Sequence, residues 1–227
     1  MPGFTKILSG GAMRPLMTDV APLFERAAGV KVATEFRLTS VLQKEIEDGV
    51  AFDIALLPRQ ELDALVQAGK IATGAVADIT RSSVGLAVKT GGRKPDISTV
   101  DALKGALLAA GSIAYSDGPS GTYIATLLQR LGIAEAMKPK TKLTGRPVAE
   151  LIAAGEAEIG MQQIVAILPV KGAELVGPLP SELQNVIIYA AGISATAQNS
   201  AMAENCIAFM RSDEVKRLVR AKGMEPG

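Results

Sequence analysis

One short segment, residues 116–123, combines glycine, proline and hydroxyl side chains in an order typical of a ligand-binding loop. It follows an apolar, strand-like run at 113–115 and leads into residues 124–131, whose apolar side chains recur at helical spacing. Gly118 and Gly121 allow the backbone to approach a ligand, and the free N–H groups of a helix start favour an anion. The residues predicted to contact that anion are Pro119, Ser120, Gly121, Thr122 and Tyr123.

Three other loops place polar groups directly after a predicted strand. The first comprises Ser9, Gly10 and Gly11, the second Arg37, Thr39 and Ser40, and the third Gln162 and Gln163. The alternative for the first loop is a tight strand–helix turn, and for the second a helix cap with a solvated arginine. An unpaired buried amide costs ~1–3 kcal/mol, so a ligand is a candidate partner for one of the two glutamines. Arg14 and Arg146 are weaker candidates and are more often solvated.

Proton-transfer chemistry has few candidate residues in this chain. There is no histidine, which removes Ser-His and Cys-His nucleophile pairs and the usual acid–base group at neutral pH. Tyr123 and Asp117 are the weak candidates for a catalytic base, although Asp117 fits better as an acceptor of backbone N–H groups. Asp53 is expected to anchor a turn, and the lone Cys206 to be buried. We expect no cofactor and no metal site.

Composition narrows the class of protein and of partner. The chain has 227 residues, of which 48% are hydrophobic and only 4% aromatic, and its formal net charge is +1. Few aromatic residues and a balanced charge argue against nucleic acid as a partner and against membrane insertion. No targeting segment is visible at the start. The expected location is therefore periplasmic if a leader has been removed, and cytoplasmic otherwise.

Strand and helix patterns alternate along the chain, which predicts an α/β fold of mostly parallel sheet flanked by helices. Ligands in such folds bind beyond the carboxyl ends of the strands, where the four polar loops fall. Strand-like stretches at about 80–90 and 185–195 are expected to be two crossover strands that join two lobes. Residues 1–80 with 195–227 would form the first lobe and residues 81–194 the second, with a ligand cleft between them.

Local signals also predict roles for single residues. Gly29 is expected to end a helix over 13–28, in which Pro22 could cause a kink or a break. Thr99 is expected to cap a helix over 100–110. Two further helices are expected over 200–210 and 213–221. The methionines expected to fill the core are Met13, Met17 and Met161.

The order of these parts resembles the type II solute-binding proteins of ABC transporters, and among them the molybdate-binding-like branch. The stretches that carry the resemblance span nearly the whole chain: residues 7–13, 24–32, 52–57, 117–123 and 154–160. The resemblance implies two α/β lobes that close over a small anion, with an ABC transporter permease as partner.

Three positions depart from the pattern of molybdate-binding members. Ala12 and Ser9 stand near the usual serine of the first loop, Leu38-Thr39-Ser40 replaces a Ser-Ser-Gly turn, and Gln162-Gln163 replaces a tyrosine. Arg37 enters the second loop, and an arginine fork matches a planar carboxylate better than a tetrahedral oxyanion. These departures favour an organic acid over molybdate.

The function predicted from the sequence is capture of a small anion, either an organic di- or tricarboxylate or a tetrahedral oxyanion such as molybdate, for ABC-type uptake. An isomerase acting on a small unsaturated tricarboxylic acid is the alternative from another class, because members of the broader family catalyse such a reaction. A cytoplasmic sensor of small anions is the third hypothesis. A binding protein is favoured over an enzyme.

Overall fold

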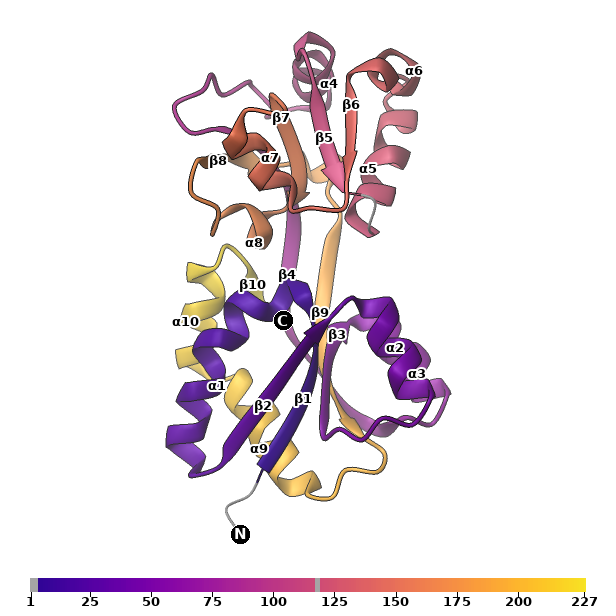
Figure 1. Cartoon of the computed structure of the whole chain (residues 1–227), viewed down its shortest axis with the longest axis vertical. Helices are drawn as coiled ribbons and strands as arrows, with labels where there is room; N and C mark the ends of the chain where they lie inside the picture. The colour runs from indigo at the N-terminus through magenta and orange to yellow at the C-terminus, as the bar shows by residue number, and fades with distance from the viewer. Residues whose placement is uncertain (1–3, 117–118) are drawn as a thin grey trace. The chain divides into compact units, whose positions relative to one another are not determined.

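The structure, a computed structural model, describes residues 4–116 and 119–227 and confirms the α/β class, with helices flanking the sheet (Figure 1). The strands are β1 (Phe4–Gly10), β2 (Lys31–Arg37), β3 (Ile54–Pro58), β4 (Ile71–Lys89), β5 (Ile113–Ser116), β6 (Thr141–Thr144), β7 (Ile159–Gln163), β8 (Ala173–Pro178), β9 (Val186–Ser194) and β10 (Glu225–Pro226). The α-helices are α1 (Arg14–Ala28), α2 (Thr39–Glu47), α3 (Arg59–Gln67), α4 (Val100–Ala109), α5 (Pro119–Arg130), α6 (Ala134–Met137), α7 (Val148–Ala154), α8 (Ile164–Ile167), α9 (Ser200–Met210) and α10 (Asp213–Ala221). Short 3₁₀ turns cover Gly11–Met13, Lys138–Lys140 and Ser181–Leu183.

The chain divides into two compact units. Unit 1 comprises Met1–Arg81 and Ile187–Gly227, and unit 2 comprises Ser82–Val186. The sequence-based division placed all of residues 186–194 with the second lobe, whereas the structure groups nearly all of β9 with unit 1. The reason is strand pairing, since β9 runs antiparallel beside β3 from Pro58↔Tyr189 to Ile54↔Ile193.

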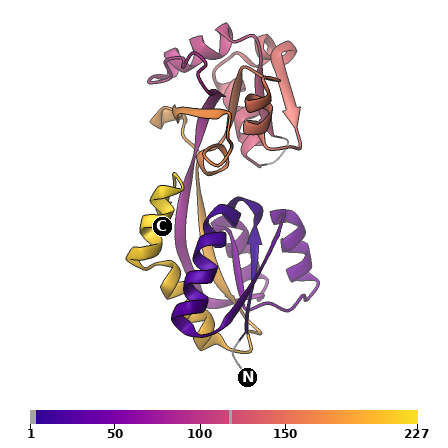
Figure 2. The same cartoon turned by 60° about the vertical axis from the view of Figure 1, so that its left-hand side comes forward.

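Unit 1 is built on a sheet whose first three strands are parallel. β1 lies between β2 and β3, and the register aligns Gly10 with Arg37 and Ser9 with Leu56. Helix α1 contacts β2 and also packs against α9 and α10, while α2 and α3 contact β1 and β3 (Figures 1 and 2). Because β1, β2 and β3 point the same way, their carboxyl ends and the loops after them share one edge of the sheet.

Helix α1 illustrates how the sequence pattern becomes local structure. Its buried side chains are those at helical spacing, namely Leu16, Met17, Val20 and Phe24. Gly29 ends the helix in the left-handed conformation with φ 67°, as predicted from its position. Pro22, where a kink or break was considered, lies inside a helix that continues from Arg14 to Ala28.

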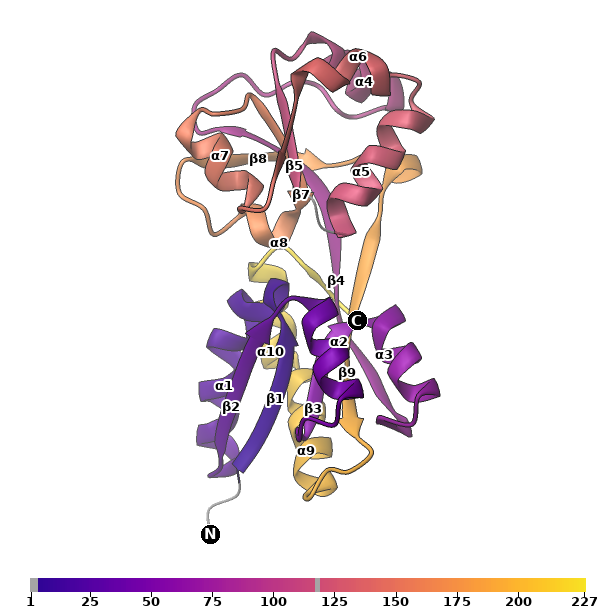
Figure 3. The ribbon, with the colours of Figure 1, turned by 45° about the vertical axis from the view of Figure 1, so that its right-hand side comes forward.

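Unit 2 has β5 at its centre, parallel to both β6 and β7 (Figure 3). β4 pairs antiparallel with β7 and β8. Helix α7 covers one face of this sheet around Ala114, and α4, α5 and α6 cover the larger core on the other face. The predicted cap Thr99 starts α4, where its hydroxyl accepts a hydrogen bond from the Ala102 N–H at 3.1 Å.

Several predictions about individual buried residues are confirmed. Met13, Met17 and Met161 are core side chains, each at most 2% exposed. Cys206 is buried on α9, and burial raises the pKa of its thiol to about 12, so the thiol stays protonated and unreactive at neutral pH. Within the described residues, none of the helices combines the length and apolar character needed to cross a membrane.

Candidate functional site

The carboxyl edge of unit 1 brings together the residues of two predicted loops. A Cβ atom placed on Gly10 would lie 3.4 Å from the Thr39 Oγ1, and one on Gly11 would lie 3.9 Å from the Arg37 carbonyl oxygen. Ser9 is fully buried, and its hydroxyl donates to the Gly10 carbonyl at 3.2 Å. The loop after β1 is therefore packed directly against the start of α2.

The predicted cap of α2 is wrong. Leu38, not Thr39 or Ser40, occupies the cap position, and no side chain caps the helix. Thr39 and Ser40 are the first residues within the helix, because the extended backbone continues one residue past the end of β2. Their hydroxyls make no hydrogen bond to the described part of the chain, and a ligand could use them as donors.

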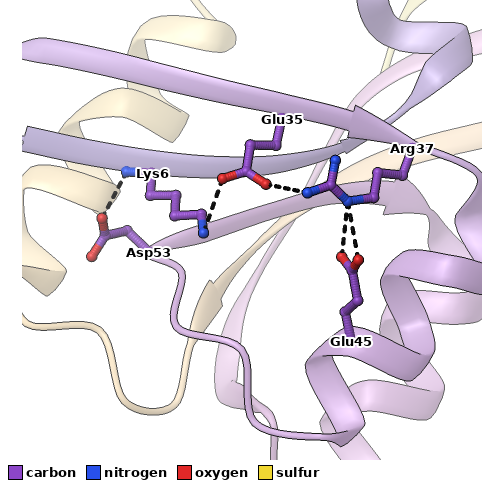
Figure 4. A network of polar contacts seen from close by, with 5 residues as sticks. All are labelled: Lys6, Glu35, Arg37, Glu45 and Asp53. Atoms are coloured by element: carbon purple, nitrogen blue, oxygen red, sulfur yellow. Dashed lines mark hydrogen bonds and ion pairs between the residues drawn. The ribbon is translucent and has the colours of Figure 1, made fainter.

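Arg37 is engaged in a chain of ion pairs along unit 1 (Figure 4). Its Nε donates to Glu45 Oε1 at 3.0 Å and its Nη2 to Glu35 Oε2 at 2.7 Å. The other oxygen of Glu35 pairs with Lys6 Nζ at 3.0 Å. Asp53 accepts the Lys6 backbone N–H at 2.8 Å, which is the anchoring role that the sequence predicts for it. In this group the three carboxylates outnumber the two cations, so the positive charge of Arg37 is fully compensated by its surroundings.

Arg59 is a basic residue at this edge that the sequence analysis overlooked. It is the first residue of α3, directly after β3, and its guanidinium bonds Asp63 at 2.8 Å and Asp78 at 2.9 Å. The hydrogen bond to Asp63, followed by that to Asp78, raises the pKa of Arg59. The position of Arg59 immediately after a buried strand could have identified it in the sequence as a candidate site residue. Arg14, a weaker candidate, stacks over the Phe36 ring with its Cζ 4.3 Å from the centroid.

Unit 2 has an equivalent edge at the carboxyl ends of β5, β6 and β7. Ser116 ends β5, and its hydroxyl lies 3.3 Å from that of Ser120 in the first turn of α5. Gly121 is buried, and a Cβ atom there would overlap the Ser116 carbonyl oxygen. The glycine is therefore required by the chain's own backbone. Pro119 opens α5, the Thr122 side chain is exposed, and Asp117 lies outside the described residues.

Tyr123, near this edge, is partly buried and packs against the main core of unit 2. Its hydroxyl donates to the Leu183 carbonyl at 2.6 Å, which ties α5 to the turn before β9. Burial raises the pKa of Tyr123, although nearby Arg130 acts in the opposite direction. The phenol therefore remains protonated at neutral pH and can donate a hydrogen bond, but it is unsuited to act as a base.

The two glutamines at the end of β7 are both buried. Gln162 Oε1 accepts the Val148 N–H at the start of α7 at 3.0 Å, which fixes the amide orientation. Its Nε2 is buried, and it has no hydrogen-bond partner in the described residues. Gln163 is 8% exposed and aligned with Val84 on β4. Two residues before Val84, the buried Ser82 hydroxyl is likewise unpaired within the described chain. In the sequence, the Ser82-Ser83 pair stands directly before a predicted strand, which could have identified Ser82 as a candidate.

Two cavities in the described residues lie elsewhere in unit 2. The larger cavity, of about 410 Å³, is lined by α4, the start of β7 and the turn at residues 93–96. None of the predicted site residues lines this cavity. Its carboxylates already accept hydrogen bonds, Glu158 from the Gly111 N–H at 2.7 Å and Asp96 from the Ser98 N–H at 2.9 Å. Arg146 pairs with Glu156 at 2.9 Å, so neither residue is free. The candidate residues therefore form two separate groups, one at the carboxyl edge of each unit.

Comparison with known proteins adds an independent line of evidence. The family model for bacterial extracellular solute-binding proteins matches residues 5–225. An aconitate isomerase from a Pseudomonas species is 30% identical over 97% of this chain and 87% of that protein. The molybdate-binding protein ModA of Escherichia coli is 22% identical over 97% of this chain and 88% of that protein.

The fold has counterparts among solved structures. The periplasmic molybdate-binding protein of Azotobacter vinelandii superposes with a TM-score of 0.77 at 16% identity, covering 98% of this chain and 99% of that one. At this level of identity the likeness establishes a shared fold and leaves the ligand to be argued from the site itself.

Proposed function

Because the chain belongs to the bacterial extracellular solute-binding protein family, of the molybdate-binding type that serves ABC-type uptake of an anion, we propose that its ligand is a small organic di- or tricarboxylate. The observation that carries the proposal is the buried Gln162 Nε2 at the carboxyl edge of unit 2, which has no hydrogen-bond partner among residues 4–116 and 119–227. A buried donor without a partner costs about 1–3 kcal/mol, which a ligand's oxygen atom would recover.

The donors of unit 1 support binding of an anion. The Thr39 and Ser40 hydroxyls, at the start of α2, make no hydrogen bond to any described residue, and the helix dipole there also favours negative charge. Gly10 and Gly11 leave the adjoining backbone open to close approach. In unit 2 the paired Ser116 and Ser120 hydroxyls at the start of α5 offer a comparable arrangement.

The preference for a carboxylate over a tetrahedral oxyanion rests on arginine. Arg37 ends β2 at the same level as Gly10, and Arg14 stands at the start of α1. A guanidinium presents two parallel N–H donors, which fit the planar carboxylate. The greater identity to an aconitate isomerase than to ModA points the same way. We further propose a periplasmic location and an ABC permease as partner.

Thermal unfolding in the presence of candidate ligands tests the proposal. The panel is citrate, cis- and trans-aconitate, tricarballylate and succinate, against molybdate, tungstate, sulfate and phosphate. A ligand at about a hundred times its Kd adds about 2.7 kcal/mol to the free energy of unfolding. We expect this stabilisation from a di- or tricarboxylate. Stabilisation by molybdate and tungstate alone would overturn the carboxylate assignment.

Two serine and threonine variants test the two edges separately. We expect Thr39→Ala and Ser120→Ala each to weaken binding of the same acid about five- to tenfold, since each removes a hydrogen bond to a charged group. Thr18→Ala and Ser200→Ala are matched controls, because Thr18 bonds only the Arg14 carbonyl of its own helix and Ser200 starts α9. Titration calorimetry supplies the affinities. Unchanged affinity in both test variants would remove these edges from the site.

An isomerase is the second candidate function, favoured by the identity to an aconitate isomerase. The reaction would remove a proton from one carbon of the acid and return a proton to another, which requires a base beside the substrate. The raised pKa of Tyr123 argues against tyrosinate in that role. Proton NMR of trans-aconitate incubated with the protein would reveal migration of the double bond. An unchanged spectrum over hours would leave only the binding function.

A further inference from the structure

Arg37 reaches the carboxyl edge of unit 1 with its charge already neutralised. We propose that Glu45 competes with the ligand for Arg37. Through this competition Glu45 would help to determine which acids bind. The inference rests on the proposed capture of a carboxylate. It assigns to Glu45 a role in specificity, although Glu45 makes no contact with the ligand itself.

The geometry identifies Glu45 as the exchangeable partner (Figure 4). Both carboxylate oxygens of Glu45 accept hydrogen bonds from the Arg37 Nε, at 3.0 and 3.2 Å, and the Glu45 side chain makes no other hydrogen bond or ion pair in the described residues. Glu35 differs, because Lys6 holds its second oxygen at 3.0 Å. Displacing Glu45 therefore breaks one interaction, whereas displacing Glu35 would disturb two cations.

Arg37 is also well placed to reach the predicted donors. It is aligned with Gly10 across the parallel β1–β2 pair, so both positions project to the same face of the sheet. On that face the Thr39 Oγ1 lies 3.4 Å from where a Gly10 Cβ would stand. The guanidinium now bends back toward Glu35, two residues earlier on the same strand. The Arg37 Nη1 makes no hydrogen bond or ion pair within the described part of the chain, so it remains available as a donor to a ligand.

The strength of the network is suited to exchange. The side chains of Arg37 and Glu45 are 43% and 31% exposed, so water and salt screen their attraction. Exposed pairs of this kind shift equilibria by about one and a half- to fivefold. A ligand carboxylate that is desolvated in the site could displace Glu45, provided that other groups already hold the molecule. A monocarboxylate has no second carboxylate to offer to Arg37, so the competition from Glu45 would weaken the binding of di- and tricarboxylates and leave that of monocarboxylates unchanged.

Titration calorimetry with tricarballylate, a saturated tricarboxylate that has no double bond to migrate, tests this role. We expect Glu45→Gln to bind it about two- to fivefold more tightly than the unaltered protein, and butyrate to gain nothing. Glu47→Gln is the matched control, because Glu47 lies on the same helix and bonds only Gln43 through its side chain, at 3.2 Å. It removes the same charge without touching Arg37.

The variant Arg37→Gln completes a double-mutant cycle. Arg37→Gln should weaken tricarballylate binding, and adding Glu45→Gln to it should then change nothing. Equal or weaker binding by Glu45→Gln, or a gain that persists without Arg37, overturns the proposed competition. If the unaltered protein binds none of the acids, the proposed function itself fails. Thermal unfolding without ligand confirms that each variant is folded.

Discussion

At the scale of the residue, Gly121 has a structural role that its residue type alone does not reveal. Glycine in a loop of this kind predicts close approach to a ligand. In the structure the close neighbour is the chain's own Ser116 carbonyl, with which a Cβ atom would overlap. Gly121 still serves the site, since it lets α5 begin immediately beside the end of β5.

Replacing Gly121 by alanine should therefore destabilise unit 2. We expect a loss of about 1–3 kcal/mol in the free energy of unfolding, because the backbone must shift to admit the methyl group. Gly105→Ala is the matched control: Gly105 lies in α4, and its Cβ position has no neighbour within 4 Å. That change should stabilise the protein by about 0.5–1 kcal/mol. Urea denaturation measures both, and equal stabilities would contradict the overlap.

At the scale of the element, helix starts divide into capped and uncapped ones. Thr99 caps α4 and Asn199 caps α9 through their side chains, whereas α2 begins at Thr39 without a side-chain cap. In the sequence, both α2 and α4 have a threonine beside the helix start, which predicts a side-chain cap in each case. The difference is one residue of register, because the extended backbone runs through Leu38 before α2 begins.

Alanine substitutions should separate these two roles of threonine. Thr99→Ala should lower the free energy of unfolding by about 1 kcal/mol, because the Ala102 N–H loses its acceptor. Thr39→Ala should change the free energy of unfolding by less than about 0.5 kcal/mol, in line with a surface substitution away from a cap. Thermal unfolding without ligand measures both. Comparable losses would mean that the Thr39 hydroxyl stabilises α2 after all.

At the scale of the whole molecule, charge is nearly balanced. The formal net charge is +1, from 24 basic and 23 acidic residues. Long-range attraction for an anion is therefore weak, and recognition depends on short-range donors. The charge is also balanced locally at the carboxyl edge of unit 1, where Arg37 and Arg59 both form ion pairs with carboxylates.

The association rate of a tricarboxylate should consequently depend little on salt. Raising ionic strength from about 0.01 to 0.1 M shortens the Debye length from about 30 to 10 Å. We expect the association rate constant, measured by stopped-flow fluorescence of a competing dye, to fall less than about threefold. A fall of about tenfold or more would show that the molecule steers anions from a distance.

The sequence predicted most of the elements and the polar loops that directly follow several strands. Helices α9 and α10 match the expected residues 200–210 and 213–221, and Gly29 and Thr99 perform the predicted roles. Helical periodicity and turn chemistry act over a few residues, so they can be read locally. Arg59 and Ser82 were overlooked because a polar residue beside a strand carries no local mark of what surrounds it.

What the sequence alone determined is therefore the α/β class, the resemblance to solute-binding proteins and the loops rich in glycine and hydroxyl groups. Only the tertiary structure decided which polar groups are free. Tyr123 is hydrogen-bonded to Leu183, 60 residues away, and Arg37 to Glu45, while the side-chain Nε2 of Gln162 has no partner in the part of the chain that the structure describes. The physical reason is that a hydrogen-bond partner is chosen by proximity in space, which the topology of the chain sets and local pattern does not.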